Sequence, residues 1–411
     1  MMILVLFAGL VLMRESRQEP LASWEDRWVD FLATTSRQPQ GEAPITLVGI
    51  DDGSLQEHPW PWSPLDFSLF FQAVLPHEPG VLAIDEVLDW EHFGLPASQL
   101  KKLPQYEKIL LDQIRRAPRV MLGAQLGFPD DPQVEPHWQE VPLLRQVKGD
   151  ISTLPDFPIV ERQPPEEYRL PAPIGFTNLP PMAGSFNSVP LIFRHHGQVI
   201  PAFTLEAVMM WLRLTPDEVA VELGSHIDLG RKRRIPIDTR GRMRVDFGTP
   251  RGAVSFEDLL FANEQATAGA RPVTDLGRLK NRVVLLARTD AKARTLPFAA
   301  RRNGSPGELF AAAIATIQNF SFICRAPLWA EGVVVAVAAL LGFFTPRWSR
   351  WGTVMAGVTA LAAHALISMA AFHQWLMWLP GVVPAGCVLC FILFRLVASD
   401  KAPQPKKPVI L

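Results

Sequence analysis

Two apolar segments that each end in acidic residues decide the fold of this chain: ITLVGIDD at residues 45–52 and VLAIDE at residues 81–86. Continuous apolar runs are typical of strands that helices cover on both faces, whereas half-exposed strands alternate apolar and polar residues. The stretch between them is long enough for a crossover helix, and Leu65, Leu69 and Phe70 give that helix an apolar face. We therefore predict a βαβ unit whose two strands are parallel neighbours.

Acidic side chains follow both strands where each ends, Asp51 and Asp52 after the first and Asp85 and Glu86 after the second. Ligands of open α/β sheets usually bind at the carboxyl ends of the strands, and converging carboxylates suit a metal ion or a cationic ligand. The alternative interpretation is that Asp and Ser cap the next helix while Gly53 allows a sharp turn. We favour capping, because helix caps are far commoner than ligand crevices.

The sequence contains no catalytic motif in a suitable context. It has no P-loop, no G-x-G-x-x-G, no H-E-x-x-H and no G-x-S-x-G. We therefore expect no catalytic residue, no protein-bound metal and no cofactor. The candidate ligand-binding residues are the strand-end acids with the serine and tryptophans that follow the first strand: Asp51, Asp52, Ser54, Trp60, Trp62, Asp85 and Glu86.

The same region resembles the CHASE type 2 (CHASE2) family of extracytoplasmic sensory domains from bacterial membrane receptors. The similarity covers about residues 20–325 as an ordered series of short blocks: IDDGS (50–54), WPW (60–62), AIDEVL (83–88), GFTN (175–178), IPIDTRGRMRVDFGTP (235–250), SFEDLL (255–260), LKNRVVLLA (279–287) and SPGELFAAAIATI (305–317). This resemblance implies a sensor that has no enzymatic activity of its own and is usually coupled to a kinase or cyclase.

Several positions depart from the family's pattern. Pro64 stands where an Arg usually follows the WPW block, Ala183 and Asn187 stand near an expected Asp-Gly and Arg, and Ala287-Arg288 replaces an expected glycine. These departures bear on ligand binding more than on the fold. We expect no output domain after residue 397, so the sequence predicts that a signal is passed to a separate partner or that the protein is not a receptor in the usual sense.

Composition excludes some classes of function. The formal net charge of −1 argues against a nucleic-acid partner, which requires a basic surface. Of the three cysteines, Cys324 is the first in the chain, so no disulfide can form within the long polar region before it. Cys387 and Cys390 lie in an apolar run, which is a poor setting for a reactive thiol pair.

Apolar stretches at both ends predict membrane helices. Three close the chain, at about residues 328–345, 352–372 and 375–397, each near the roughly 20 residues that cross a bilayer, with tryptophans at their borders. Residues 1–18 begin with a shorter apolar run, which we interpret as the tail of a first membrane helix whose beginning is missing. We expect a second, helical module beside the α/β domain.

The distribution of basic residues predicts the orientation. Arg347 and Arg350 lie between the first two stretches and lysines follow the third, whereas residues 373–374 contain neither Lys nor Arg. The positive-inside rule then places the large domain outside a bacterial inner membrane. The predicted parts are a partial N-terminal membrane helix (1–18), an extracytoplasmic sensory domain with a mixed or parallel sheet (19–326), three transmembrane helices (327–398) and a short basic cytoplasmic tail (399–411).

Small residues recur every fourth position in the second stretch, at Gly352, Ala356 and Ala360, and His364 continues the series. Small side chains let two membrane helices approach closely, so this stripe is a candidate packing face. His364 is a candidate relay, because an ionisable group inside a membrane often has a function. A neutral imidazole bonded to a neighbouring helix is the alternative that we favour.

These observations predict a multi-pass sensor that detects an extracytoplasmic signal and relays it through membrane helices. Its expected partners are the lipid bilayer, an unknown small ligand and a separate signalling or envelope protein, with a homodimer as a further option. One alternative is a membrane-anchored scaffold of the cell envelope that senses nothing. Another is a metal-dependent hydrolase that uses the strand-end carboxylates.

Overall fold

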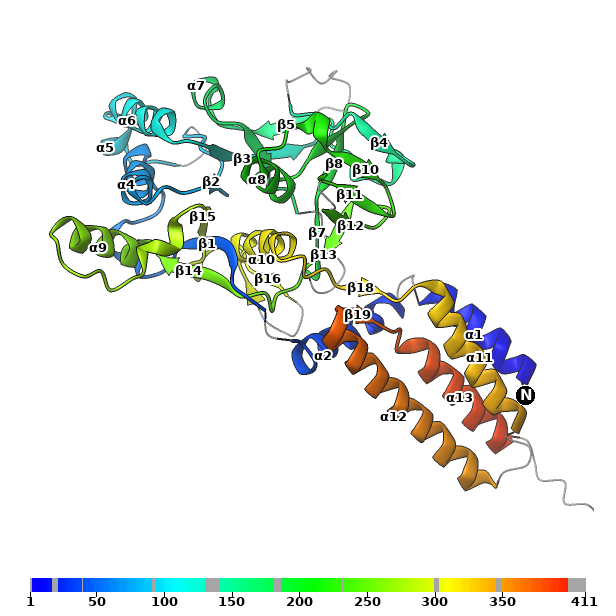
Figure 1. Ribbon diagram of the computed structural model, residues 1–411. Helices are drawn as coiled ribbons and strands as arrows, with labels where there is room; N and C mark the ends of the chain where they lie inside the picture. Colours follow the sequence, from blue (N-terminus) through cyan, green and yellow to red (C-terminus); the bar gives the residue numbers. More distant parts are fainter. Residues whose placement is uncertain are drawn as a thin grey trace, which may run out of the picture. The chain divides into compact units, whose positions relative to one another are not determined.

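The computed structural model describes residues 2–16, 21–38, 40–90, 94–129, 141–179, 186–230, 233–298, 303–344 and 349–397. The chain forms two compact units. We call Pro39–Phe322 the sheet unit, and Met1–Gln38 together with Ile323–Leu411 the helical unit. Figure 1 shows that the first is built of sheets and helices and the second almost entirely of helices, so the predicted α/β fold with an added helical module is confirmed at this level.

A seven-stranded sheet forms the centre of the sheet unit, in the order β14-β1-β15-β2-β3-β5 with β6 also paired to β3. All its pairings are parallel except that of β3 with β5. Its strands are β1 (Ala43–Ile50), β2 (Val81–Ile84), β3 (Val120–Gly127), β5 (Ile159–Arg162), β6 (Ile174–Phe176), β14 (Arg251–Ser255) and β15 (Val283–Arg288).

The prediction that the first two strands are neighbours is wrong, because β15 lies between them. Ile50 of β1 is in register with Arg288 of β15, and Ile84 of β2 is in register with Leu286. β15 is buried over its whole length except at its last residue, which suits the most enclosed place in the sheet. The local sequence pattern contains no information about this pairing, since β15 comes some 200 residues after β2.

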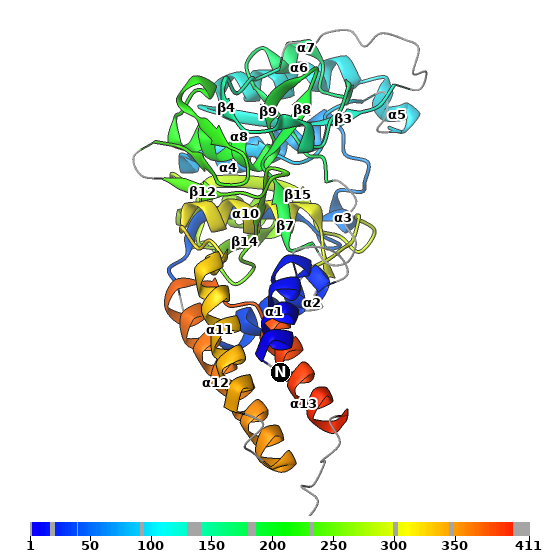
Figure 2. The same cartoon turned by 90° about the vertical axis from the view of Figure 1, so that its right-hand side faces the viewer.

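Helices cover both faces of this sheet, as its uninterrupted apolar strands require: Figure 1 shows helices on both sides of its strands, and Figure 2 looks onto one of these helix layers. On one face α4 (Pro64–Val74), α6 (Leu103–Arg116) and α9 (Phe256–Thr267) enclose a core rich in phenylalanine. On the other face α8 (Phe203–Leu212) and α10 (Pro306–Gln318) pack together, with the Phe203 and Phe310 rings 5.1 Å apart. The short helices are α3 (Ser54–Glu57), α5 (Ala97–Leu100) and α7 (Glu166–Arg169), with 3₁₀ turns at Leu75–His77, Ile151–Thr153, Pro216–Glu218 and Leu276–Leu279.

Smaller sheets complete the unit. A four-stranded sheet has the order β12-β11-β10-β4, and three strand pairs are β8 with β9, β7 with β13, and β16 with β17. Their bounds are β4 (Gln146–Lys148), β7 (Ser188–Pro190), β8 (Ile192–His195), β9 (Gln198–Pro201), β10 (Ala220–Glu222), β11 (His226–Asp228), β12 (Arg234–Pro236), β13 (Arg242–Arg244), β16 (Leu296–Pro297) and β17 (Asn303–Gly304).

The helical unit contains five helices and one short strand pair among its described residues: α1 (Met2–Glu15), α2 (Leu21–Thr35), α11 (Leu328–Phe344), α12 (Arg350–Trp375), α13 (Val382–Val397), β18 (Cys324–Arg325) and β19 (Met377–Trp378). In the described part of the chain, α12 alone is long and apolar enough to cross a membrane, from Trp351 to Trp375. The helices α11 and α13 are apolar but shorter, so three spans stay a prediction.

Polar contacts in the helical unit converge on the loop between α12 and α13. Arg325 of β18 forms a two-point ion pair with Glu331 at 2.8 and 3.3 Å, and its guanidinium lies 5.1 Å from the ring centre of Trp378. Backbone N–H groups at the start of α13, those of Gly381 and Val382, donate to the carboxylate of Glu25. Two segments distant in sequence, β18 and α2, are therefore tied to the same loop.

One buried carboxyl makes the stability of the sheet unit depend on pH. Glu206 of α8 is 7% exposed, its Oε2 has no hydrogen-bond partner among the described residues, and burial raises its pKa from 4.5 to about 7. The folded state therefore binds this proton more tightly than the unfolded state does. The free energy of unfolding falls as the pH rises from about 4.5 through 7, by up to about 3 kcal/mol.

We expect Glu206→Gln to raise the melting temperature of the full chain at pH 8 and to change it little at pH 5, because the amide remains neutral at both. Thermal unfolding at the two pH values measures this. Glu222→Gln, which changes an exposed glutamate of β10, is the matched control and should shift neither value. An equal shift at both pH values for Glu206→Gln would contradict the assignment.

Candidate functional site

The predicted site residues lie at the carboxyl edge of the central sheet, but they form two groups. Asp51 follows β1 and Asp85 follows β2, and the end of β15 stands between them. Since neighbouring strands are about 4.8 Å apart, these two strand ends are separated by roughly 10 Å. The inserted strand contributes Arg288 as its last residue and Asp290 just beyond it.

The first group is structural. Asp51 Oδ1 accepts hydrogen bonds from the backbone N–H of Ser54 at 2.9 Å, from its hydroxyl at 2.7 Å and from the hydroxyl of Ser255 at 3.0 Å. Burial alone would raise the pKa of Asp51, but the bonds from Ser54 and Ser255 outweigh burial and lower it. Asp51 thus begins α3 and ties it to the start of α9, as the capping interpretation expects.

The two candidate tryptophans, Trp60 and Trp62, also lie in different environments. Trp62 is fully buried, its indole N–H donates to the carbonyl of His58 at 2.9 Å, and its ring packs against Phe67 and Phe256. Trp60 is only half-buried, and the Arg288 guanidinium lies 4.4 Å from its ring centre. Trp62 therefore belongs to the core, while Trp60 lines the carboxyl edge.

Arg288 is neutralised within the site. Its guanidinium forms a two-point ion pair with Asp290, with both nitrogen to oxygen distances at 2.8 Å. Although burial opposes ionisation, the hydrogen bonds and charge of Arg288 lower the pKa of Asp290. The pair, stacked on Trp60, therefore adds little net charge between the two groups of acids. Exposed Asp52 accepts from the backbone N–H of Ala291 at 3.3 Å and so holds the loop after this pair.

The second group, Asp85 and Glu86, has no such partners. Both side chains are half-buried, and among the described residues neither carboxylate has a side-chain hydrogen bond or ion pair. Burial raises the pKa of Asp85 well above its usual value, and the neighbouring charge of Glu86 adds to this effect. Burial also raises the pKa of Glu86, against the opposing charges of Arg288 and Arg162. These two carboxyls are the electrostatically unsatisfied part of the edge.

Helix α10 begins beside this second group. A Cβ placed on Gly307, in the first turn of α10, would overlap the methyl group of Ala287 and would lie 3.5 Å from Asp85 Oδ2. Glycine is therefore needed here for the close approach of the helix to β15. The partial positive charge of a helix N-terminus favours the ionised form of a nearby carboxylate.

Sequence reasoning noted Arg288 only as a departure from the family's pattern, and it placed neither Arg288 nor Gly307 in the candidate site. Arg288 had a usable signal, since it is the basic residue that directly follows an apolar strand, at the same relative position as the acids. Gly307 had only its place within the SPGELF block, which does not reveal what it packs against.

The arrangement suits electrostatic binding better than metal ligation. Among the described residues, no three His, Cys, Asp or Glu side chains come close enough together to hold a metal ion. Two adjacent carboxyls with raised pKa values can bind a cation, and they release protons when they do so. No nucleophile with an adjacent base accompanies them in the contacts described above.

The comparison with family models supplies the wider context. The CHASE2 domain model matches residues 2–346 of the 411-residue chain, which is most of its length. The chain belongs to the CHASE2 family. Neither curated proteins nor solved structures give a match. CHASE2 is a sensory domain family, and the two half-buried carboxyls at this edge are features that a ligand-binding site could use.

The candidate relay residues of this CHASE2 protein lie on α12. Ala356, Ala360 and His364 line an apolar groove of about 480 Å³ whose other walls come from α11 and α13. Gly352 instead lies at the start of the helix, where its N–H donates to Ser349 Oγ. His364 Nε2 lies 3.0 Å from the carbonyl oxygen of Pro380, in the loop between α12 and α13, so the imidazole is bonded to this loop and its role as a relay stays a prediction.

We predict that Asp51→Ala destabilises the CHASE2 domain by about 1 to 2 kcal/mol, because three hydrogen bonds that fix two helix starts are lost. Asp51→Asn should cost clearly less, since its amide oxygen can replace the single accepting atom Oδ1. Denaturant unfolding of the full chain measures both variants. Gln56→Ala, at an exposed position of α3, is the control. Equal costs for Asp51→Asn and Asp51→Ala would argue against the capping role.

Proposed function

We propose that this CHASE2 protein is an integral membrane sensor that binds a small cationic ligand at Asp85 and Glu86 and relays the event through its helices to a separate partner protein. The observation that supports this most is a pair of half-buried carboxyls at the carboxyl edge of the sheet that has no side-chain hydrogen bond or ion pair within the described part of the chain. A cation placed there would offset the cost of burying both charges.

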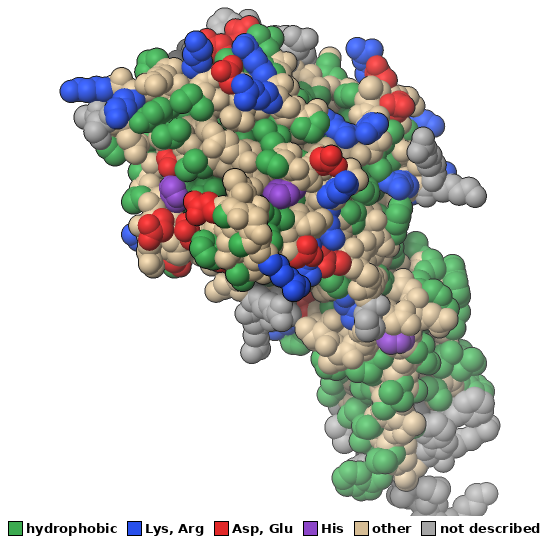
Figure 3. All heavy atoms as spheres, turned by 60° about the vertical axis from the view of Figure 1, so that its left-hand side comes forward, with side chains coloured by type: hydrophobic (Ala, Val, Ile, Leu, Met, Phe, Trp, Pro, Cys, Tyr) green, Lys and Arg blue, Asp and Glu red, His purple; other side chains and the backbone are tan. Residues whose placement is uncertain are grey.

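The surface of the helical unit supports the membrane part of the proposal. Figure 3 shows that hydrophobic side chains dominate this surface, whereas Lys, Arg, Asp and Glu are interspersed over the sheet unit. Large apolar side chains of α11, α12 and α13 are half or more exposed: Val333, Val337, Leu340, Met355, Val358, Leu366, Ile367, Leu389 and Leu393. Lipid would cover them, so we propose three spans and an extracytoplasmic sheet unit.

Ligand binding transmits a signal only if two conformations of the protein bind the ligand unequally. The loop between α12 and α13 is suited to receive such a conformational change, because β19 within it pairs with β18 and the start of α13 is bonded to Glu25. A shift of β18 would therefore move two membrane helices together.

We expect a panel of amines and divalent cations to contain compounds that raise the melting temperature of the wild-type chain but not of Asp85→Asn. Binding should weaken as the pH falls toward the raised pKa of Asp85, because the carboxyl must be ionised to attract a cation. Asp112→Asn, at an exposed position of α6, is the matched control and should respond as the wild type does. A stabilising compound that acts equally on Asp85→Asn would remove this site.

The topology is tested separately. A reporter fused after residue 411 should be active only on the cytoplasmic side, and one inserted at residues 373–374 only on the outer side, as the positive-inside rule requires. The opposite pattern would remove the extracytoplasmic placement of the sheet unit and the sensor function with it.

A further inference from the structure

Helix α10 begins at the candidate site, and its last residues lie where the chain enters and leaves the sheet unit. It has 13 residues and is therefore about 20 Å long. Every side chain from Leu309 to Gln318 is buried, against β1 and β15 on one side and α8 on the other. A close-packed interior does not deform continuously, so a helix enclosed in this way is expected to shift as one body.

At its first turn, α10 lies against the site. The helix packs so closely against Ala287 that a side chain at position Gly307 would have no space, and Asp85 Oδ2 lies next to the same turn. The turn is fixed by a capping box, in which the Glu308 side chain accepts from the N–H of Ser305 at 2.7 Å. A change in the charge or position of Asp85 therefore acts on an ordered helix start.

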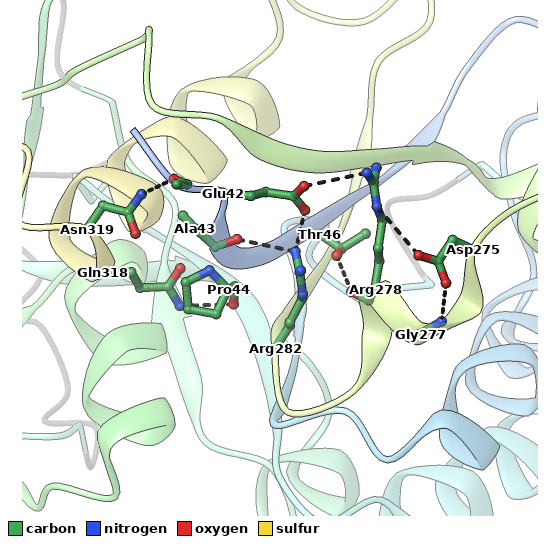
Figure 4. Close-up of polar contacts among 11 residues, drawn as sticks. Glu42, Ala43, Pro44, Thr46, Asp275, Gly277, Arg278, Arg282, Gln318 and Asn319 are labelled. Carbon is green, nitrogen blue, oxygen red and sulfur yellow. Dashed lines mark hydrogen bonds and ion pairs between the residues drawn. The ribbon is translucent and has the colours of Figure 1, made fainter. Parts of the chain in front are cut away.

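At its other end, α10 holds the segment that leads into β1. Gln318 Nε2 donates to the carbonyl of Pro44 at 3.2 Å, and Asn319 Nδ2 donates to the carbonyl of Gly41 at 2.6 Å. Figure 4 shows these two amides beside the ion pairs of Glu42 with Arg278 and Arg282. The backbone that enters the sheet unit is thus bonded to the end of α10 by side-chain amides.

The backbone that leaves the sheet unit is the continuation of the same helix. The N–H of Ser321 donates to the carbonyl of Thr316, and the Ser321 hydroxyl lies 2.6 Å from that of Thr249. The next strand along the chain is β18, at Cys324–Arg325, which pairs with β19. The C-terminal end of α10 is therefore bonded to the chain that enters the sheet unit and continues directly into the chain that leaves it.

We propose that α10 is the coupling element of the sensor, and that the amides of Gln318 and Asn319 transfer its displacement to the segment Gly41–Pro44. This inference rests on the proposed function, since it takes the surroundings of Asp85 as the input. The inference adds a route for the signal. Ligand binding at the carboxyl edge of the sheet would reach the opposite edge, where the two chain segments that join the sheet unit to the helical unit begin.

The test perturbs the helix start and measures the far end without any ligand. Gly307→Ala should push α10 away from Ala287 and raise the hydrogen exchange of amides at residues 41–46 severalfold, in the full chain in lipid nanodiscs. The space-conserving pair Gly307→Ala with Ala287→Gly should restore wild-type exchange. If Gly307→Ala does not fold, Ala287→Gly alone, which loosens the same contact, is the second perturbation and should also change exchange at residues 41–46.

A double-mutant cycle then identifies the coupling residues. Gln318→Ala with Asn319→Ala should raise exchange at residues 41–46 by itself, and adding Gly307→Ala should raise it no further. Gln72→Ala, which changes an exposed amide on α4, is the control background, in which Gly307→Ala should keep its full effect.

Exchange that changes only around residues 285–290 and 305–309 in Gly307→Ala would overturn the proposal. An effect on residues 41–46 that persists in full without the two amides would overturn their role in it. Neither outcome depends on a ligand, so failure of the coupling and failure of the proposed ligand site are distinguishable.

Discussion

The burial of β15 on both faces, between β1 and β2, is the constraint on which the rest of the sheet unit depends. A strand enclosed in this way has to be apolar along its length, and its ends are the first places where polar residues can stand. At one end these are Arg288 and Asp290, which satisfy each other. At the other end Arg282 holds Glu42 and the carbonyl of Ala43. The two ends of β15 therefore position polar side chains at both edges of the sheet: at the candidate site, and at the opposite edge, where the chain enters β1.

Local pattern was sufficient to predict β1, β2 and the helix between them, but not the order of the strands. The apolar runs of β1, β2 and β15 are visible in the sequence because each is buried on both faces. Their order depends on contacts between residues some 200 positions apart, such as Leu286 with Ile84, and no local signal encodes these. That one difference changed the site, since it separated Asp51 from Asp85 and placed an ion pair between them.

The residue types of the site were predictable, but their roles were not. Asp51 and Asp85 both follow a strand, yet Asp51 is bonded by Ser54 and Ser255, whereas no described side chain bonds to the carboxyl of Asp85. Trp60 and Trp62 share one motif, and only the structure shows that Trp62 is a core residue. Whether a polar side chain is structural or available for a ligand depends on partners that come from other strands and helices.

The bond between Asn319 and the carbonyl of Gly41 brings residues near the two chain ends of the sheet unit next to each other. A domain whose ends adjoin can be inserted into a surface loop of a host protein with little strain on either chain. The sheet unit is thus suited to transfer between proteins as a cassette, and its ends could be fused to each other and new ones opened elsewhere without breaking the central sheet.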